Sequence, residues 1–135
     1  MKVINKLSLE KHDGEYTDWP LKSTLLVDGK PTKTKLPGYK MLCSIQLKDD
    51  RILVVIDYDC PFEEQATAVL LNSDYKILTK KLFPSGVLID GSSIIAKSEK
   101  CFEVKTFGSE NFSVKILNKR LFFWKSLIEI EFVKV

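Results

Sequence analysis

The sequence predicts an all-β protein, or a β-rich one with one short helical turn, whose strands follow one another as an antiparallel meander. Short apolar runs rich in Val, Ile, Leu, Phe and Tyr recur along the chain, and turn-forming pairs such as Asp28-Gly29 separate them. No segment keeps the apolar period of an amphipathic helix. We therefore expect about eight to ten strands that form a sandwich or a curled half-barrel.

The first half of the chain predicts three strands and a loop. Residues 24–27 end at the hairpin-type turn Asp28-Gly29, and the lysines, threonines and prolines of residues 30–38 predict a surface loop. Apolar and polar residues then alternate over residues 39–47, which predicts a strand with one buried face. The unbroken apolar run 52–56 predicts a central strand that is covered on both faces.

The second half predicts further hairpins. Residues 68–71 and 75–78 flank the turn formers Asn72-Ser73-Asp74, and a short helical turn fits around residues 62–66. The last segment alternates clearly, so we expect it to be the longest strand. Further strand-length runs lie at residues 87–89, 94–95, 102–107 and 112–117, with a turn at residues 108–111.

Length and composition indicate one folded domain over residues 1–135. Of the 135 residues, 44% are hydrophobic and 29% charged, which excludes a disordered or collagen-like chain. No window approaches the roughly 18 consecutive apolar residues of a membrane span, and the first residues lack the apolar run of a secretory signal. We expect a cytoplasmic protein that does not bind a membrane.

The sequence offers little for catalysis. Its one histidine, His12, stands in a polar stretch, where we expect a solvated loop residue. A Ser-His or Cys-His nucleophile would have to use it, and no nucleophile motif is present. Asp57 and Asp59 would share one face of a strand, but this spacing is common. We predict that the protein is not an enzyme.

The cysteines indicate neither a disulfide set nor a metal or cofactor site. Cys43, Cys60 and Cys101 show no C-x-x-C spacing. Cys43 and Cys101 lie in strand-like runs, so we expect them to be small core residues. Carboxylates surround Cys60 and would raise its thiol pKa. The Asp57-x-Asp59 pair lacks the glycine and closing glutamate of a calcium loop. We expect no metal and no cofactor.

Charge is distributed unevenly. The formal net charge is +3, yet residues 57–75 contain five acids and no base, whereas residues 21–56 carry seven bases against three acids. An acidic block of this kind can speed and orient the encounter with a cationic partner. A solvated loop between strands is the alternative interpretation.

The acidic segment Asp57-Tyr58-Asp59-Cys60-Pro61-Phe62-Glu63-Glu64-Gln65, followed by the predicted hairpin 68–78, resembles the immunity proteins of bacterial polymorphic toxin and contact-dependent growth-inhibition systems. The resemblance lies in size, all-β organisation and the acidic strand-loop-hairpin, over residues 40–135. It implies a compact cytoplasmic protein that binds and blocks one cognate toxin domain, often a nuclease. The positive net charge departs from the acidic character of many nuclease inhibitors.

This hypothesis places the partner-binding site in the acidic segment. A rigid β scaffold with charged groups around aromatic anchors has the features of a tight protein inhibitor. Burial in the core is the alternative for the aromatic residues. Reversal of Asp59, Glu63 and Glu64 to lysine should weaken partner binding and leave the fold intact. The expected contacts are Asp57, Tyr58, Asp59, Phe62, Glu63, Glu64, Asp74 and Tyr75.

The alternative function is a small β-barrel module that binds nucleic acid or a small ligand. Bases and aromatics that could serve a single-stranded nucleic acid occur in two groups, but the acidic block would repel phosphate, so we do not expect nucleic acid as the partner. The sequence leaves open a monomer or a weak dimer that pairs through an edge strand at residues 121–135. The two groups are Lys30, Lys33, Lys35 and Tyr39, and Lys119, Arg120, Phe122, Phe123 and Trp124.

Overall fold

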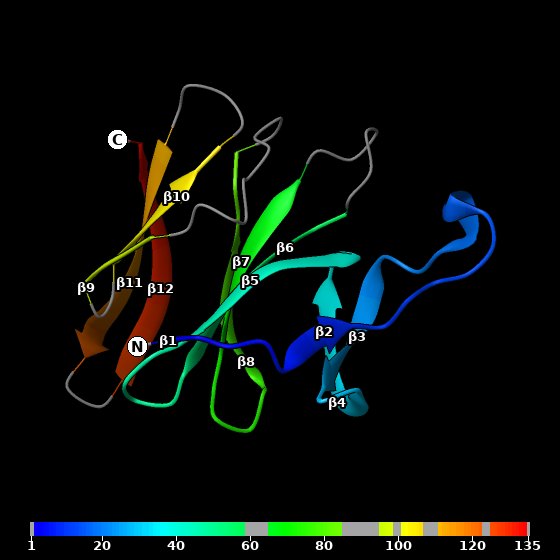
Figure 1. Ribbon diagram of the computed structural model, residues 1–135. Coiled ribbons are helices and arrows are strands. Elements are labelled where there is room, and N and C mark those ends of the chain that lie inside the picture. Colours follow the sequence, from blue (N-terminus) through cyan, green and yellow to red (C-terminus); the bar gives the residue numbers. More distant parts are fainter. Residues whose placement is uncertain are drawn as a thin grey trace.

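Three open antiparallel sheets lie side by side as layers in the computed structural model (Figure 1), which confirms the predicted all-β class. None of the sheets closes into a barrel. For residues 95–96, 119–122 and 125–127 the structure describes the backbone alone. The described residues are 2–58, 65–84, 95–98, 101–106, 111–122 and 125–134. None of their helices is long and apolar enough to cross a membrane.

The middle layer is a five-stranded sheet, and a smaller sheet covers each of its faces. Its strands are β1 (Lys2–Val3), β5 (Lys40–Gln46), β6 (Ile52–Asp57), β7 (Ala66–Leu71) and β8 (Ile77–Leu82), in that spatial order. One outer sheet contains β2 (Leu7–Leu9), β3 (Lys22–Val27) and β4 (Lys30–Pro37). The other contains β12 (Lys125–Lys134), β11 (Asn111–Phe122), β10 (Cys101–Lys105) and β9 (Ile95–Ser98). Within the described ranges there is one 3-10 turn, η1, which spans Tyr16–Asp18.

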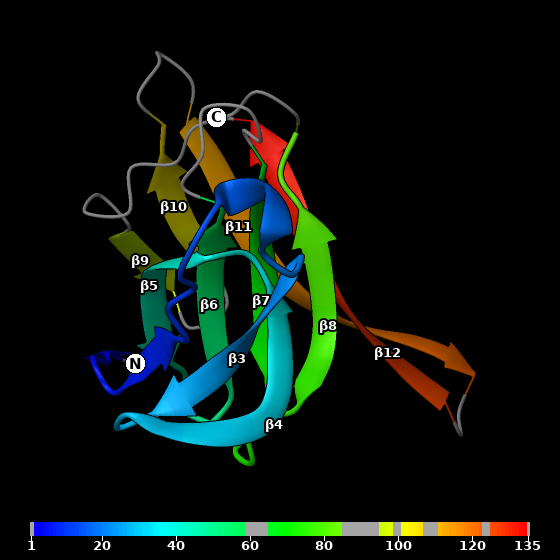
Figure 2. The ribbon, with the colours of Figure 1, turned by 90° about the vertical axis from the view of Figure 1, so that its right-hand side faces the viewer.

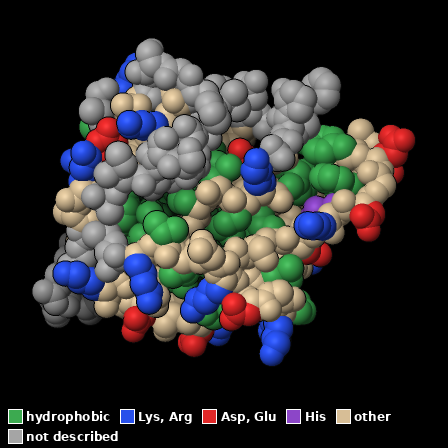
Figure 3. Space-filling view, in the orientation of Figure 1, with side chains coloured by type: hydrophobic (Ala, Val, Ile, Leu, Met, Phe, Trp, Pro, Cys, Tyr) green, Lys and Arg blue, Asp and Glu red, His purple; other side chains and the backbone are tan. Residues whose placement is uncertain are grey.

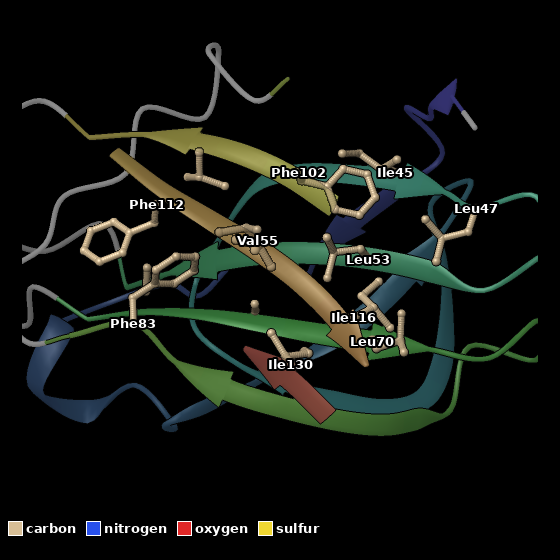
Figure 4. Close-up of a cluster of buried hydrophobic side chains, with 14 residues drawn as sticks. Ile45, Leu47, Leu53, Val55, Leu70, Phe83, Phe102, Phe112, Ile116 and Ile130 are labelled. Atoms are coloured by element: carbon tan, nitrogen blue, oxygen red, sulfur yellow. The ribbon is translucent and has the colours of Figure 1, made fainter. Parts of the chain in front are cut away.

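Strand β6 occupies the centre of the molecule, as its unbroken apolar run predicts. Successive side chains of a strand point to opposite faces. Leu53 and Val55 therefore pack into a first core against the β9–β12 sheet (Figure 4), whereas Val54 and Ile56 pack into a second core against the β2–β4 sheet. Strand β7 likewise contributes Leu70 to the first core and Leu71 to the second, so both layers depend on these two strands.

Phenylalanines dominate the first core. Phe102 on β10 is fully buried, and Phe83, which follows β8, stacks on Phe132 of β12 with ring centroids 4.1 Å apart. Full burial of one such side chain contributes about 1.5 to 3 kcal/mol. These contacts hold the β9–β12 sheet against the middle sheet.

The predicted loop at residues 30–38 is wrong, because most of it forms strand β4. The turn at Asp28-Gly29 is confirmed, with φ values of 52° and 78°, and it joins β3 to β4. Along β4, Thr32 and Thr34 are half-buried and Lys33 is exposed. This is a strand alternation of polar residues, which hydrophobic patterning overlooks. Edge strands also tolerate proline.

The single buried face predicted for residues 39–47 is wrong as well. The β5–β6 register shifts between Met41 and Cys43. As a result Met41 packs against the second core, whereas Cys43 and Ile45 pack against the first. A bulge inserts one residue and so reverses the face to which later side chains point.

The remaining predictions have mixed outcomes. The β7–β8 hairpin is confirmed, although β8 begins at Ile77. The last strand is not the longest, since β11 has 12 residues and β12 has 10, and antiparallel pairing extends β11 through its polar stretch. Ala66, expected at the end of a helical turn, begins β7. Residues 62–64, 87–89, 94 and 108–110 lie outside the described part of the chain.

Candidate functional site

The described members of the predicted acidic site lie at opposite ends of one strand. Asp57 ends β6 and is paired with Ala66, whereas Asp74 follows Leu71 at the other end of β7. Five strand intervals separate these ends by about 17 Å. The chain therefore does not gather its described acids from residues 57–75 into one patch. Asp59, Phe62, Glu63 and Glu64 lie outside the described residues.

At the end of β7 near Asp74, the contacts described for Tyr75 are ones that stabilise the fold. Tyr75 packs against the second core, and its carbonyl oxygen accepts a hydrogen bond of 2.7 Å from the Thr34 hydroxyl. The Lys6 ammonium lies 5.7 Å from the centroid of its ring. Asn72 Oδ1 accepts the N–H groups of Asp74 and Lys76 and so closes the turn. Tyr75 fastens this turn to β4.

At the other end, Tyr58 joins a group of five rings, the aromatic cluster: His12, Tyr16, Trp19, Tyr39 and Tyr58. Tyr39 is its hub. The Tyr39 ring centroid lies 5.0 Å from that of Tyr58, 5.2 Å from Trp19, 5.3 Å from His12 and 5.8 Å from Tyr16. All five side chains are half-buried. The cluster therefore packs internally and still reaches the surface.

Three of these rings come from the arm, residues 10–21, which leaves β2 and returns at β3. Two hydrogen bonds join Glu10, at the start of the arm, to Thr24 of β3. The Glu10 N–H donates to Thr24 O at 3.0 Å, and the Glu10 carboxylate accepts the Thr24 N–H at 2.7 Å. Within the arm, Trp19 Nε1 donates to Asp13 O at 3.1 Å. Figure 1 shows the arm at one end of the molecule, beyond β3, and Figure 2, which views the molecule from that end, shows the arm in front of the middle sheet.

His12 anchors the arm, which corrects its expected place in a solvated loop. Its Nε2 lies 2.8 Å from Ser23 Oγ, and the Ser23 hydroxyl donates to Gly38 O at 2.5 Å. A serine hydroxyl has one proton, so Ser23 must accept from His12, and Nε2 carries a proton. His12 therefore does not act as a base toward Ser23. Ser23 is also 0% exposed, which excludes the pair as a nucleophilic dyad.

Gly38 brings the two halves of the cluster together. Its φ of +149° is disfavoured for other residues, and a Cβ there would lie 2.8 Å from Asp57 O. The neighbouring Tyr39 N–H donates to the same oxygen at 2.8 Å. Close approach at Gly38 thus places Tyr39 beside Tyr58.

The arm also carries acidic charge. Asp13, Glu15 and Asp18 are exposed, and Lys11 is the only base in residues 10–21. The hydrogen bond from the Thr24 N–H lowers the pKa of Glu10, so its carboxylate stays charged. Figure 3 shows the histidine beside hydrophobic side chains, with acidic side chains at the same end of the molecule. We call this region, the aromatic cluster with these three exposed acids, the aromatic-acidic surface.

The sequence offered a signal for this surface that hydrophobic patterning does not detect. Residues 10–21 contain His12, Tyr16 and Trp19 among acids, and they show no strand or helix period. Tyr and Trp rings combine a large apolar area with a polar atom, so they suit surfaces that become buried on binding. A search for Tyr and Trp next to acids would have selected the arm.

Reactive groups are few in the described part of the chain. Among these residues, no group of three or more His, Cys, Asp and Glu side chains could hold a metal ion. Burial raises the pKa of Cys43 to about 12, as expected for a core thiol. Cys101 is half-buried, with its Sγ 3.2 Å from Ser113 Oγ.

Comparisons with the known protein families, with the curated proteins and with the solved structures find no match for this chain.

Proposed function

We propose that this protein is a non-enzymatic inhibitor of the immunity-protein kind, which binds a cognate toxin domain through the aromatic-acidic surface. The observation that carries the proposal is the packing of Tyr39 against four other half-exposed rings beside three exposed acids. The resemblance to immunity proteins supplies the class of partner.

The geometry of the cluster supports a binding role because its rings are held in place before any partner arrives. Each ring touches at least one other ring, and the hydrogen-bonded chain from His12 through Ser23 to Gly38 fixes the arm. A preorganised aromatic anchor loses little conformational entropy on binding. Tyr and Trp are also enriched among the residues that dominate interface energies.

The charge of the surface supports a basic partner. Asp13, Glu15 and Asp18 would attract lysines and arginines and so raise the rate of encounter. A nuclease that holds phosphate with basic side chains would present such a surface. A cytoplasmic inhibitor would meet a toxin of this kind where it acts.

The test is capture of partners from native lysate with the tagged protein, after nuclease treatment and washing at moderate salt. We expect one stoichiometric protein partner. The Asp18→Lys variant should bind it at least about tenfold more weakly, since it reverses a charge inside the proposed interface. The matched control Asp74→Lys changes net charge equally at the far end of β7 and should bind normally.

Two results would contradict the proposal. Equal loss of affinity in the two charge variants would remove the aromatic-acidic surface as the interface. Recovery of nucleic acid alone, and only when nuclease is omitted, would favour the nucleic-acid alternative, whose affinity falls steeply with salt.

A further inference from the structure

Strand β8 presents an open edge on the middle sheet. It is the last strand in the sheet order, and among the described residues no strand pairs with its outer side. Leu82 on this strand is 57% exposed, and Ile77 and Leu78 are each 39% exposed. An edge that combines unpaired backbone groups with exposed apolar side chains is a template for a further strand.

The hydrogen-bond alternation identifies the outward-pointing backbone groups. The Phe83 N–H donates to Ala66 O at 2.9 Å, so these two residues form a hydrogen-bonded pair. Pairs of an antiparallel ladder alternate between hydrogen-bonded and non-hydrogen-bonded types. From the β7–β8 register, Lys81 therefore bonds toward β7, whereas the N–H and C=O groups of Lys80 and Leu82 point away from it.

The side chains of β8 are basic as well as apolar. Lys80 and Lys81 of β8 are exposed, as is Lys76 just before the strand, and the Lys81 ammonium lies 5.5 Å from the Phe132 ring centroid, on the side of the β9–β12 sheet. Opposite charges across strands stabilise pairing, and like charges oppose it. Two β8 strands in a dimer would bring their own lysines together, so the charge pattern disfavours a second copy of this chain.

We propose that the β8 edge binds an extended segment of a partner protein in which acidic and apolar residues alternate, so that this segment adds a sixth strand to the middle sheet. Because alternate residues of a strand point to opposite faces, the apolar side chains of the added strand would lie on the face of Leu82 and the acidic ones on the opposite face, beside Lys81. This site is separate from the aromatic-acidic surface and does not depend on the function proposed for it.

The first test uses a short synthetic peptide in which Glu alternates with Val, added to the isotope-labelled full chain. Hydrogen exchange followed by NMR should show new protection of the Lys80 and Leu82 amides, at least about tenfold, since these N–H groups would gain partners. The Lys81 amide, already bonded to β7, should change much less. Equal protection along β8, or none at saturating peptide, would overturn the proposal.

Variants separate strand addition from simple charge attraction. Lys80→Pro removes an outward N–H and leaves the β7 ladder intact, so the variant should fold and bind the peptide at least about tenfold more weakly. The double variant Lys80→Glu with Lys81→Glu should instead prefer a control peptide in which Lys alternates with Val. Unchanged binding of the Glu peptide by folded Lys80→Pro would contradict strand addition.

Two controls complete the test. Trp19→Ala, on the aromatic-acidic surface, should bind the Glu peptide like the unaltered chain, so a failure at one surface does not imply a failure at the other. Sedimentation should show that the unaltered chain does not dimerise through β8. A dimer that Lys80→Pro dissociates would mean that a second copy, and not an acidic segment, occupies the edge.

Discussion

The molecule contains two groups of aromatic side chains that differ in chemistry and place. Phe83, Phe102 and Phe112 are buried in the first core, between two sheets. The rings of the aromatic cluster come mainly from Tyr and Trp and are half-exposed, and three of the five belong to an arm without strand structure. The phenylalanines have no polar atom to satisfy, so burial costs them nothing in hydrogen bonds. The difference separates the residues that stabilise the fold from those we propose to bind a partner.

The polar atoms of the aromatic cluster also distinguish it from the phenylalanine core. Trp19 Nε1 donates to Asp13 O, and the Tyr58 hydroxyl donates to Leu21 O at 3.2 Å. These two rings are thus oriented by the backbone as well as by their neighbours. Orientation without full burial is what a preformed interface requires.

The largest expected effect on the free energy of unfolding comes from a substitution in the phenylalanine core. Phe102→Ala should lower the free energy of unfolding by about 3 to 5 kcal/mol, because Phe102 is 0% exposed and leaves a cavity. Urea denaturation measures this change. A loss below about 1 kcal/mol would mean that the first core is not closely packed there.

The next effect concerns the junction between the two regions. Gly38→Ala should lower the free energy of unfolding by about 3 kcal/mol, through backbone strain and the clash with Asp57 O. The same change should separate Tyr39 from Tyr58 and reduce partner affinity. Gly29→Ala is the control, because its φ is also positive but a Cβ there meets nothing. Equal losses in the two variants would refute the close approach.

A smaller effect should follow removal of the Ser23 hydroxyl. Ser23→Ala leaves His12 Nε2 and the Gly38 carbonyl without their shared partner and should cost about 1 to 2 kcal/mol. Hydrogen exchange in the arm should rise more than in β6. Uniform changes over both elements would show that the arm is not anchored by this chain of bonds.

The smallest effect is pH-dependent. The Glu10 pKa is lowered from 4.5 by the Thr24 N–H, so its carboxylate stabilises the arm above pH 4.5 and this contribution is lost as pH falls through the lower folded value. Trp19 fluorescence, measured in a Trp124→Phe background, should change over that range. Glu10→Gln should remove the transition, and its persistence would assign it to another group.

Sequence patterning predicted β6, whose burial is continuous, and missed β4, whose burial is partial. The run 52–56 identified β6 because every residue in it is apolar. Strand β4 was missed because two of its three inward positions are Thr32 and Thr34, which a division into apolar and polar residues places in the same class as the lysines between them.

The candidate site was missed for a related reason. Tyr58 was predicted, but its neighbours come from residues 10–21 and from Tyr39, which β-sheet pairing brings to the end of β6. The described acids of the sequence block, Asp57 and Asp74, instead lie at the two ends of β7. Contacts between residues far apart in the chain depend on register and bulges, which local sequence does not determine.

The most direct test of the account compares Trp19→Ala with Tyr75→Ala in binding to the captured partner, by isothermal titration calorimetry. We predict that Trp19→Ala weakens binding at least about tenfold and that its urea midpoint stays close to that of the unaltered chain, since Trp19 lies in the arm. Tyr75→Ala, which removes a ring from the second core, should bind normally and unfold at lower urea. Normal binding by Trp19→Ala together with weak binding by Tyr75→Ala would contradict the account and place the interface at the β7–β8 turn.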